Sequence, residues 1–290
     1  MQWRTAMSLT ITPFEAPLGA EIRGIDLRHD LDDEKFSIIE TAWHDHGVIV
    51  IRDQKLDKGE QIAFAKRLGT VGERGLPAEK RREADDHGGA IMMITNKRGP
   101  DGKFIGSVPE GELWFHSDLS YRLEPDKATM LHALALPDSG GNTMFSNMYK
   151  AFENIPDALK KKLAGRKVLH AYDFATTAGY DLDQGLDKVQ HYWQPIFVRH
   201  PVTGRTALYI SRLMSAQIEG LSRVESDSTL QQLFEIAEDP AIIYEHVWQM
   251  GDLVTCDNRC CIHARHDFPS NQLRMLQRCT VRGEPMIAAA

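Results

Sequence analysis

Short apolar runs separated by Gly, Pro and Asp dominate the hydrophobic pattern of this chain from residue 128 onward. Such runs, recurring at fairly regular intervals, are typical of the strands of a barrel or jelly roll. An earlier run, residues 47–52, is apolar and rich in β-branched side chains, as expected of a central strand. The later strands are expected at residues 128–136, 142–146, 167–172, 195–200, 207–211, 242–248, 253–257 and 273–283. The pattern therefore predicts a mainly β fold.

Helices are expected at the edges of this β core. Two early stretches, opened by Asp32 and by Asp57, place apolar residues three and four positions apart, which predicts amphipathic helices. Two further helices are expected at residues 151–163 and 226–237. The fold class predicted is thus a barrel or jelly roll with flanking α-helices.

The chain shows no internal repeat, low-complexity tract or linker, so residues 1–290 are expected to form a single domain. Residues 75–112 are polar and rich in glycine, with one strand-like interruption at residues 91–94. A loop of this length in a compact domain is usually a lid or a disordered segment. Residues 75–112 and 173–192 are therefore expected to be active-site loops or lids.

Composition and charge narrow the class of partner. Of 290 residues, 42% are hydrophobic and 26% charged, and the net charge of −7 is spread along the chain. A nucleic-acid-binding surface needs a concentrated basic face, so no nucleic-acid partner is expected. No apolar run reaches the roughly 18 residues that a membrane span requires, so no membrane partner is expected.

The four cysteines lie in the last 35 residues, at Cys256, Cys260, Cys261 and Cys279. Their spacing resembles neither a disulfide framework nor a zinc ribbon with two Cys-x-x-Cys pairs. Buried, reduced thiols in a cytoplasmic protein are therefore expected.

A candidate metal site begins with His116 and Asp118. In an extended chain alternate residues point to the same face, so these two side chains can converge on one ion. A distant histidine would complete two nitrogen ligands and one carboxylate, leaving three positions of an octahedral metal open, as in iron(II) oxygenases. The His-x-Asp spacing alone favours a structural His–Asp pair over a metal site, and only the context of the motif reverses this balance.

A second cluster supplies that context. His263 follows the strand-like run at residues 253–255, and Arg274 and Arg278 follow it by 11 and 15 residues. The four-residue interval gives both arginines the same parity on a strand. Two arginines that point into a barrel are costly unless they bind anions there, and arginine is suited to bidentate binding of carboxylates. Surface salt bridges are the alternative interpretation of this pair.

A third element is Thr143, which follows Gly140-Gly141 and could donate its hydroxyl inward from the start of a strand.

In chain order these elements resemble the family that contains taurine dioxygenase and the 2,4-dichlorophenoxyacetate dioxygenases. Residues 18–27 and 61–69 also resemble that family, so the similarity covers nearly the whole chain. The motifs that carry it are Trp114-Phe115-His116-Ser117-Asp118, Gly140-Gly141-Asn142-Thr143, Asp257-Asn258-Arg259 followed by His263, and the two arginines at 274 and 278.

The resemblance implies a double-stranded β-helix, a cupin-like jelly roll, that uses iron(II), 2-oxoglutarate and oxygen. It implies that Thr143 and Arg274 bind the distal carboxylate of 2-oxoglutarate and that Arg278 faces the anionic group of the primary substrate. The iron ligands it implies are His116, Asp118 and His263. Dimers or tetramers are common in the family, so a homo-oligomer is expected.

The expected reaction is hydroxylation of a small anionic organic substrate, a carboxylate or sulfonate, with release of succinate and CO2. A hydroxylated carbon that carries an ether oxygen, sulfonate or amine would collapse with cleavage of the C–O, C–S or C–N bond. Besides Arg278, the candidate substrate residues are Arg74, Arg212 and Tyr121, with an exposed side chain as the alternative for Arg74 and Arg212 and core packing for Tyr121.

The sequence departs from the family pattern at several positions. Cys256 stands where a tryptophan commonly precedes the Asp-Asn-Arg motif, and Phe115 separates Trp114 from His116. Arg74 and Glu112 lie near the places of a histidine and an asparagine that help hold taurine. Taurine itself is therefore not the expected substrate.

Two other functions compete with this interpretation. Two histidines and an aspartate also suit zinc, as in a cupin-type hydrolase or isomerase. That alternative gives the inward arginines Arg274 and Arg278 no purpose. A non-catalytic ligand or metal sensor on the same fold is the second alternative, although a sensor would not need the ligands and the anion-binding residues together.

Overall fold

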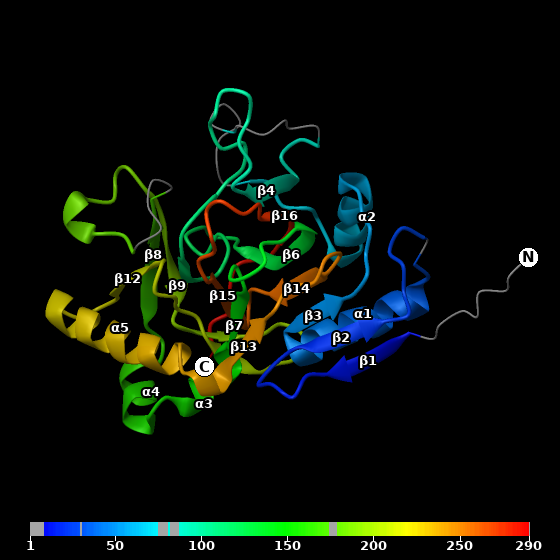
Figure 1. The fold of residues 1–290 in the computed structure, drawn as a ribbon. Helices are drawn as coiled ribbons and strands as arrows, with labels where there is room; N and C mark the ends of the chain where they lie inside the picture. Colours follow the sequence, from blue (N-terminus) through cyan, green and yellow to red (C-terminus); the bar gives the residue numbers. More distant parts are fainter. Residues whose placement is uncertain (1–8, 30, 75–80, 82–86, 174–178, 290) are drawn as a thin grey trace, which may run out of the picture.

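Two antiparallel sheets pack face to face in the computed structural model, which describes residues 9–29, 31–74, 81, 87–173 and 179–289 (Figure 1). The larger sheet has the strand order β1 (Thr10–Pro13), β2 (Ala20–Arg23), β3 (Val48–Ile51), β14 (Leu253–Asp257), β6 (Asp126–Ala135), β16 (Met275–Arg282) and β4 (Ile91–Thr95). The smaller has the order β13 (Ile243–His246), β7 (Thr143–Asn147), β15 (Cys261–Arg265) and β5 (Leu113–His116). Only the β2–β3 pair among these is parallel. The predicted jelly roll is confirmed.

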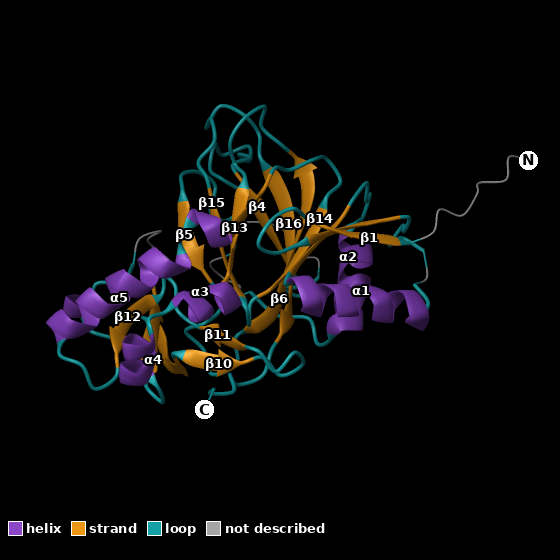
Figure 2. Ribbon diagram, turned by 90° about the horizontal axis from the view of Figure 1, so that it is seen from below, coloured by secondary structure: helices purple, strands orange, loops and turns teal. Residues whose placement is uncertain are grey.

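Two further sheets and three helices extend the smaller sheet (Figure 2). One sheet has the order β12 (Ser215–Ile218), β8 (Lys167–Tyr172) and β9 (Gln190–Pro195), and the other pairs β10 (Phe197–Arg199) with β11 (Thr206–Leu208). The helices there are α3 (Met148–Asn154), α4 (Asp157–Leu163) and α5 (Arg223–Ala237), with the short 3-10 turns η2 (Leu182–Gln184) and η3 (Pro240–Ile242).

Helices α1 (Asp33–His46) and α2 (Lys58–Leu68) cover the outer face of the larger sheet (Figure 2). Both begin where the sequence predicts, because Asp32 and Asp57 each accept a hydrogen bond from a first-turn backbone N–H. In α2 the reciprocal bond from Glu60 completes a capping box. The central strands of the larger sheet are thus buried on both faces.

Strand β3 shows why its sequence is apolar without interruption. Val48 and Val50 point into the core between the two sheets, whereas Ile49 and Ile51 point into the core beneath α1 and α2. Alternate side chains of a strand face opposite sides, so a strand buried on both faces needs an apolar residue at every position. All four side chains are fully buried.

The helix predicted at residues 151–163 is two helices, and this corrects the prediction. Helix α3 ends at Asn154 and α4 begins at Asp157, with Ile155 and Pro156 between them in extended conformations. Proline lacks a backbone N–H and disfavours helical geometry in the residue before it, so the chain turns there. Strands β9 and β12 were not expected from the sequence.

All four cysteines are free and buried, as the sequence predicts. Within the described residues, no helix combines the length and the apolar character needed to cross a bilayer.

Candidate active site

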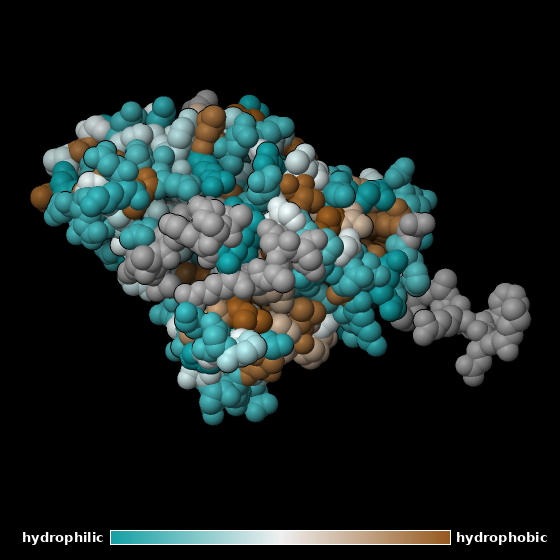
Figure 3. Space-filling model, turned by 90° about the horizontal axis from the view of Figure 1, so that it is seen from above, coloured by the Kyte–Doolittle hydropathy of each residue, from teal (hydrophilic) through white to brown (hydrophobic). Residues whose placement is uncertain are grey.

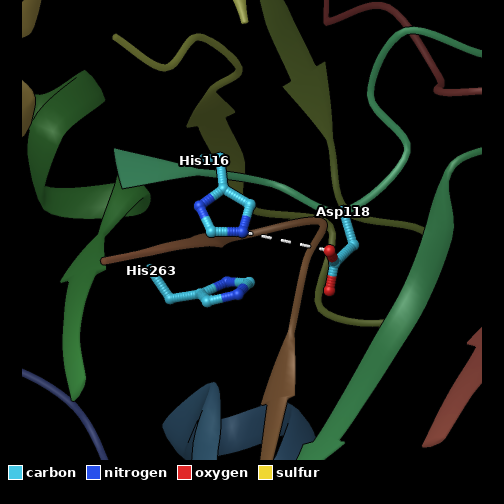
Figure 4. Close-up of side chains that lie close together, drawn as sticks. All are labelled: His116, Asp118 and His263. Carbon is cyan, nitrogen blue, oxygen red and sulfur yellow. Dashed lines mark ion pairs between the residues drawn. The ribbon is translucent and has the colours of Figure 1, made fainter. Parts of the chain in front are cut away.

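The two candidate histidine ligands come from neighbouring strands of the smaller sheet. His116 ends β5 and is directly opposite His263 in the pairing of β5 with β15. Cross-strand neighbours lie close together, and the two imidazole rings are 4.2 Å apart between centroids. Residues 147 positions apart in sequence are therefore brought together by one strand pairing, as the close-up in Figure 4 shows.

Asp118 completes the group, although not from an extended strand as the sequence predicts. β5 stops at His116, and Asp118 lies in the following turn, where Leu119 has a left-handed φ of 56°. The Asp118 carboxylate is 4.0 Å from Nε2 of His116. The donor atoms of all three side chains lie within 4.8 Å of one another. The turn, and not strand alternation, aims Asp118 at the histidines.

The protonation states of these residues fit a divalent metal. His116 Nδ1 lies 2.9 Å from the carbonyl oxygen of Trp114. Because a carbonyl oxygen can only accept a hydrogen bond, Nδ1 carries the imidazole proton and Nε2 is available as a metal ligand. Burial lowers the pKa of His116, and burial together with His116 lowers the pKa of His263 to about 3. Burial acts to raise the pKa of Asp118, but Arg278, the two histidines and the hydrogen bond from Thr129 together outweigh it, so this pKa is lowered. Two neutral imidazoles and a carboxylate are the ligand forms that iron(II) requires.

Thr129 and Arg278 orient the Asp118 carboxylate. Thr129 donates its hydroxyl to Oδ2, and the Arg278 guanidinium lies 2.7 Å from Oδ1. Asn258 in turn donates to Thr129 Oγ1 at 3.0 Å. Partners of this kind fix the direction of a metal ligand.

A second cluster of possible ligands among the described residues, His200, Asp257 and Cys260, is structural. His200 Nδ1 accepts hydrogen bonds from the backbone N–H groups of residues 202 and 203, so Nε2 carries the proton that is donated to Asp257 at 3.0 Å. Arg259 binds both carboxylate oxygens of Asp257. Both nitrogens of His200 and both oxygens of Asp257 are thus used in hydrogen bonds within the protein, and the cluster is an ion pair that holds the turn between β14 and β15.

The metal ligands open onto a cavity of about 370 Å³ between the two sheets. This volume is within the usual range for small-molecule sites and leaves room for more than one small ligand. Its floor comes from both sheets, and its apolar walls are Met92, Ile94, Phe104, Leu113, Leu119, Leu131, Leu213, Met214 and Leu276.

The predicted co-substrate residues, Arg274 and Thr143, both line this cavity. Arg274 is buried at 2% exposure and donates to the carbonyl of Gly141 through Nε at 3.1 Å and through Nη2 at 2.8 Å. It forms no ion pair with any residue that the structure describes. Burial, followed by the charge of Arg265, lowers the pKa of Arg274 to about 9. A buried guanidinium without a carboxylate partner is well suited to bind an anion.

Three of the four predicted substrate residues also line the cavity. Arg278 reaches it beside the metal ligands, and Tyr121 stacks on Tyr172 with 5.5 Å between ring centroids. Arg74 is buried and donates to Ser107 Oγ at 2.9 Å.

Arg212 does not line the cavity, which corrects the sequence-based expectation. Its guanidinium binds the Glu238 carboxylate at 2.8 Å and lies over the ring of Phe234, both at the C-terminal end of α5. The carboxylate partner and the aromatic face hold the side chain away from the metal site.

The expected active-site loops contribute unequally. Residues 104–111, here called the roof segment, run along one side of the cavity, and five of them line it. The face that carries the loops after β4 exposes hydrophobic side chains among hydrophilic ones (Figure 3). Of the stretch 173–192, none of the described residues lines the cavity, and residues 174–178 lie outside the described part of the chain. A lid role for either stretch stays a prediction.

Arg265, a buried arginine in the cavity wall, was not predicted from the sequence. Strand parity could have found it, because Arg265 follows His263 by two residues and so faces the same side of β15.

Comparisons with known proteins agree with this geometry. Residues 10–280 match the family described as taurine catabolism dioxygenase TauD, TfdA family. The (S)-phenoxypropionate/alpha-ketoglutarate-dioxygenase of Sphingobium herbicidovorans is 30% identical over 296 residues, covering 95% of each chain. The alpha-ketoglutarate-dependent 2,4-dichlorophenoxyacetate dioxygenase of a Burkholderia species is 31% identical, covering 91% of each. A taurine dioxygenase structure from Burkholderia xenovorans superposes with a TM-score of 0.80 at 24% identity, covering 97% of this chain and 91% of that one, which supports the fold.

Proposed function

This chain belongs to the taurine catabolism dioxygenase TauD, TfdA family and is an iron(II)- and 2-oxoglutarate-dependent dioxygenase, and on that premise we propose that it hydroxylates a small organic anion with an apolar body. The observation that carries the proposal is the position of Arg278, whose guanidinium lies inside the cavity 2.7 Å from the candidate iron ligand Asp118. An anionic group bound there would hold the rest of the substrate beside the metal.

The roles follow the positions of the side chains. His116, Asp118 and His263 are the proposed iron ligands, and Arg274 with Thr143 is the proposed site of the distal carboxylate of 2-oxoglutarate (alpha-ketoglutarate). Bound iron would activate oxygen while 2-oxoglutarate is oxidised to succinate and CO2 and a substrate carbon is hydroxylated. The protein supplies orientation and a water-excluding cavity around these ligands.

Arg278, Arg74 and Tyr121 are the proposed substrate residues. Arg278 would bind the carboxylate or sulfonate, and the aromatic and aliphatic wall around Tyr121 would cover the apolar body. Two of the relatives are named for aryloxy carboxylates, (S)-phenoxypropionate and 2,4-dichlorophenoxyacetate, which have this combination of anionic head and apolar body. Hydroxylation of a carbon next to an ether oxygen would give an unstable product that collapses with cleavage of the C–O bond, so such substrates would be split in two.

The relatives do not favour the zinc hydrolase or the ligand sensor, because the names they carry are those of dioxygenases. A homo-oligomer and a cytoplasmic location are further proposals, for which the family supports the first and reduced cysteines the second. Light scattering of the purified protein would test the oligomer.

The test of the proposed function has two steps. Anaerobic protein loaded with iron(II) should develop a visible absorption band when 2-oxoglutarate is added. A panel of carboxylates and sulfonates should then be screened for substrate-dependent release of succinate, with aryloxy carboxylates among them. Replacement of His116 by alanine should abolish both signals; retention of either one would refute the ligand assignment. An absent band in the wild-type protein would refute the 2-oxoglutarate chemistry.

A further inference from the structure

Arg265 is a buried cavity arginine that the reaction described above does not use. Its side chain is 5% exposed, extends from β15 two residues beyond His263, and forms no ion pair with any residue in the described part of the chain. Its guanidinium donates instead to three backbone carbonyl groups of the roof segment. Nη1 donates to Val108 at 2.7 Å, and Nη2 donates to Glu110 at 3.0 Å and to Gly111.

The roof segment depends on these bonds at one end. In the middle of the segment Ser107 is held on β4, where its N–H donates to the carbonyl of Met93 at 2.9 Å. Beyond Ser107 the chain leaves β4, and Val108 has a φ of 47°. A β-branched residue with positive φ is strained and persists only where its surroundings hold it. The Val108 carbonyl accepts the bond from Arg265 at this strained position.

Arg265 also lies beside the proposed co-substrate site. The guanidinium carbons of Arg265 and Arg274 lie over the same ring, that of Phe268, at 5.4 and 5.7 Å from its centroid. Thr143 is the partner of Arg265 in the pairing of β7 with β15. Neither arginine has a carboxylate partner among the described residues, and Nε of Arg265 has no hydrogen-bond acceptor there. Two buried guanidinium groups that share one aromatic ring repel each other, as the effect of Arg265 on the pKa of Arg274 indicates, and a bound carboxylate relieves that repulsion.

We propose that Arg265 is a positioning residue that couples co-substrate binding to the roof of the cavity: its charge strengthens binding of the distal carboxylate of 2-oxoglutarate at Arg274, and its hydrogen bonds hold residues 108–111 in place. The proposal rests on the proposed function, in which Arg274 binds that carboxylate. Coupling is reciprocal, so 2-oxoglutarate should order the roof segment to the extent that the roof segment strengthens 2-oxoglutarate binding.

The test compares Arg265→Met, Arg265→Lys and the control Arg212→Met, which removes an arginine outside the cavity. Binding of 2-oxoglutarate is measured by titration of the absorption band of the anaerobic iron(II) protein and by equilibrium dialysis of labelled 2-oxoglutarate. Order of the roof segment is measured by hydrogen exchange of a peptide that spans residues 104–112, with and without 2-oxoglutarate.

In the wild type and Arg212→Met, 2-oxoglutarate should slow exchange in this peptide. Arg265→Met should raise the dissociation constant about tenfold or more, the change expected when about 1.4 kcal/mol of binding is lost. It should also remove the 2-oxoglutarate effect on exchange. Arg265→Lys keeps the charge but not the planar set of donors, so it should bind 2-oxoglutarate more tightly than the methionine variant while exchange of the roof segment stays fast.

The outcomes separate this inference from the function on which it rests. A wild-type protein that fails to bind 2-oxoglutarate would refute the dioxygenase function and the inference together. Wild-type binding with an unchanged dissociation constant or unchanged exchange in Arg265→Met would overturn the inference alone. If the methionine variant fails to fold by circular dichroism, Arg265→Lys decides: wild-type exchange of the roof segment in that variant overturns the proposal.

Discussion

Gly141 and Arg274 constrain each other at the scale of single residues. The Arg274 guanidinium can bind the Gly141 carbonyl because no side chain stands between them: a Cβ on Gly141 would lie 2.8 Å from Nε of Arg274. Gly141 also has a φ of 69°, in the left-handed region that favours glycine. The glycine that the sequence suggested as a turn residue therefore also makes room for the anion-binding side chain.

Replacement of Gly141 by alanine should displace the Arg274 guanidinium, because the added Cβ would take its place. The loss of its contact with 2-oxoglutarate should weaken binding about tenfold or more, which corresponds to about 1.4 kcal/mol or more. Titration of the anaerobic iron(II) protein would measure the change. Gly165→Ala is the matched control, since Gly165 has a similar φ of 72° but nothing within 4 Å of its added Cβ. Both variants should lose about 1–2 kcal/mol of stability from backbone strain, and only Gly141→Ala should lose affinity. Equal affinities in the two variants would contradict the steric argument.

Replacement of Arg274 and replacement of Arg278 should raise KM for different substrates. Arg274→Met is expected to raise KM for 2-oxoglutarate by about tenfold or more, in line with loss of a charged hydrogen bond, and to leave KM for the primary substrate nearly unchanged. Arg278→Met is expected to raise KM for the primary substrate instead. Steady-state assays of succinate with each substrate varied in turn would show the split. The assignment fails if both variants raise the same KM.

Single residues were predictable from the sequence where strand periodicity fixes them. Arg274 and Arg278 share parity, and the structure places both in the cavity wall. Asp118 could be named but its geometry could not, because a turn with a left-handed Leu119 directs it. Arg212 was misjudged because its partner, Glu238, lies 26 residues away on α5, and pairing over that distance follows from tertiary packing.

At the scale of elements, local patterns predicted single strands but not their partners. β14 and β8 begin and end at the predicted residues, because flanking glycine and charged residues mark their ends. The pairing of β15 with β5 joins segments far apart in sequence, and no local signal specifies it. That pairing is what brings His116 to His263, so the site depends on the topology that the sequence pattern leaves open.

Asp257 holds the turn between β14 and β15, and removal of its carboxylate should lower the free energy of unfolding. Asp257 is fully buried and bound by Arg259 and His200. Asp257→Ala leaves the Arg259 charge uncompensated and should cost about 3–5 kcal/mol at pH 7, as for other broken buried ion pairs. Urea unfolding would measure the loss.

The pH dependence of this loss has a definite sign. Burial acts to raise the pKa of Asp257, but Arg259 and His200 together outweigh it, and the folded-state pKa is lowered below the ordinary value of 3.8. A lowered pKa contributes stability above the unfolded-state value, and that contribution is lost as pH falls through the folded-state value. The difference in stability between wild type and Asp257→Ala should therefore be constant from pH 5 to pH 7, roughly, and shrink below about pH 4. A difference that grows on acidification would contradict the ion-pair role.

At the scale of the whole molecule, the proposed ligands tie the two sheets together. His116, His263 and Thr143 belong to the smaller sheet, whereas Arg278 belongs to the larger and Arg274 immediately precedes its strand. A metal and a 2-oxoglutarate molecule bound to these groups would add contacts that only the folded state possesses. Ligands of that kind stabilise the fold by mass action, by about 2.7 kcal/mol at a concentration one hundred times the dissociation constant.

Thermal unfolding should therefore show a two-step rise in Tm. Manganese(II), a redox-stable substitute for iron(II), should raise Tm, and 2-oxoglutarate should raise it further only when the metal is present, because its chelating end needs the metal. Each kcal/mol corresponds to about 2–4 °C for a domain of this size class, so the combined shift should be several degrees. His116→Ala should abolish both steps, whereas Arg274→Met should keep the first and lose most of the second. A 2-oxoglutarate shift without metal, or an undiminished second step in Arg274→Met, would mean that the co-substrate binds elsewhere than between the two sheets.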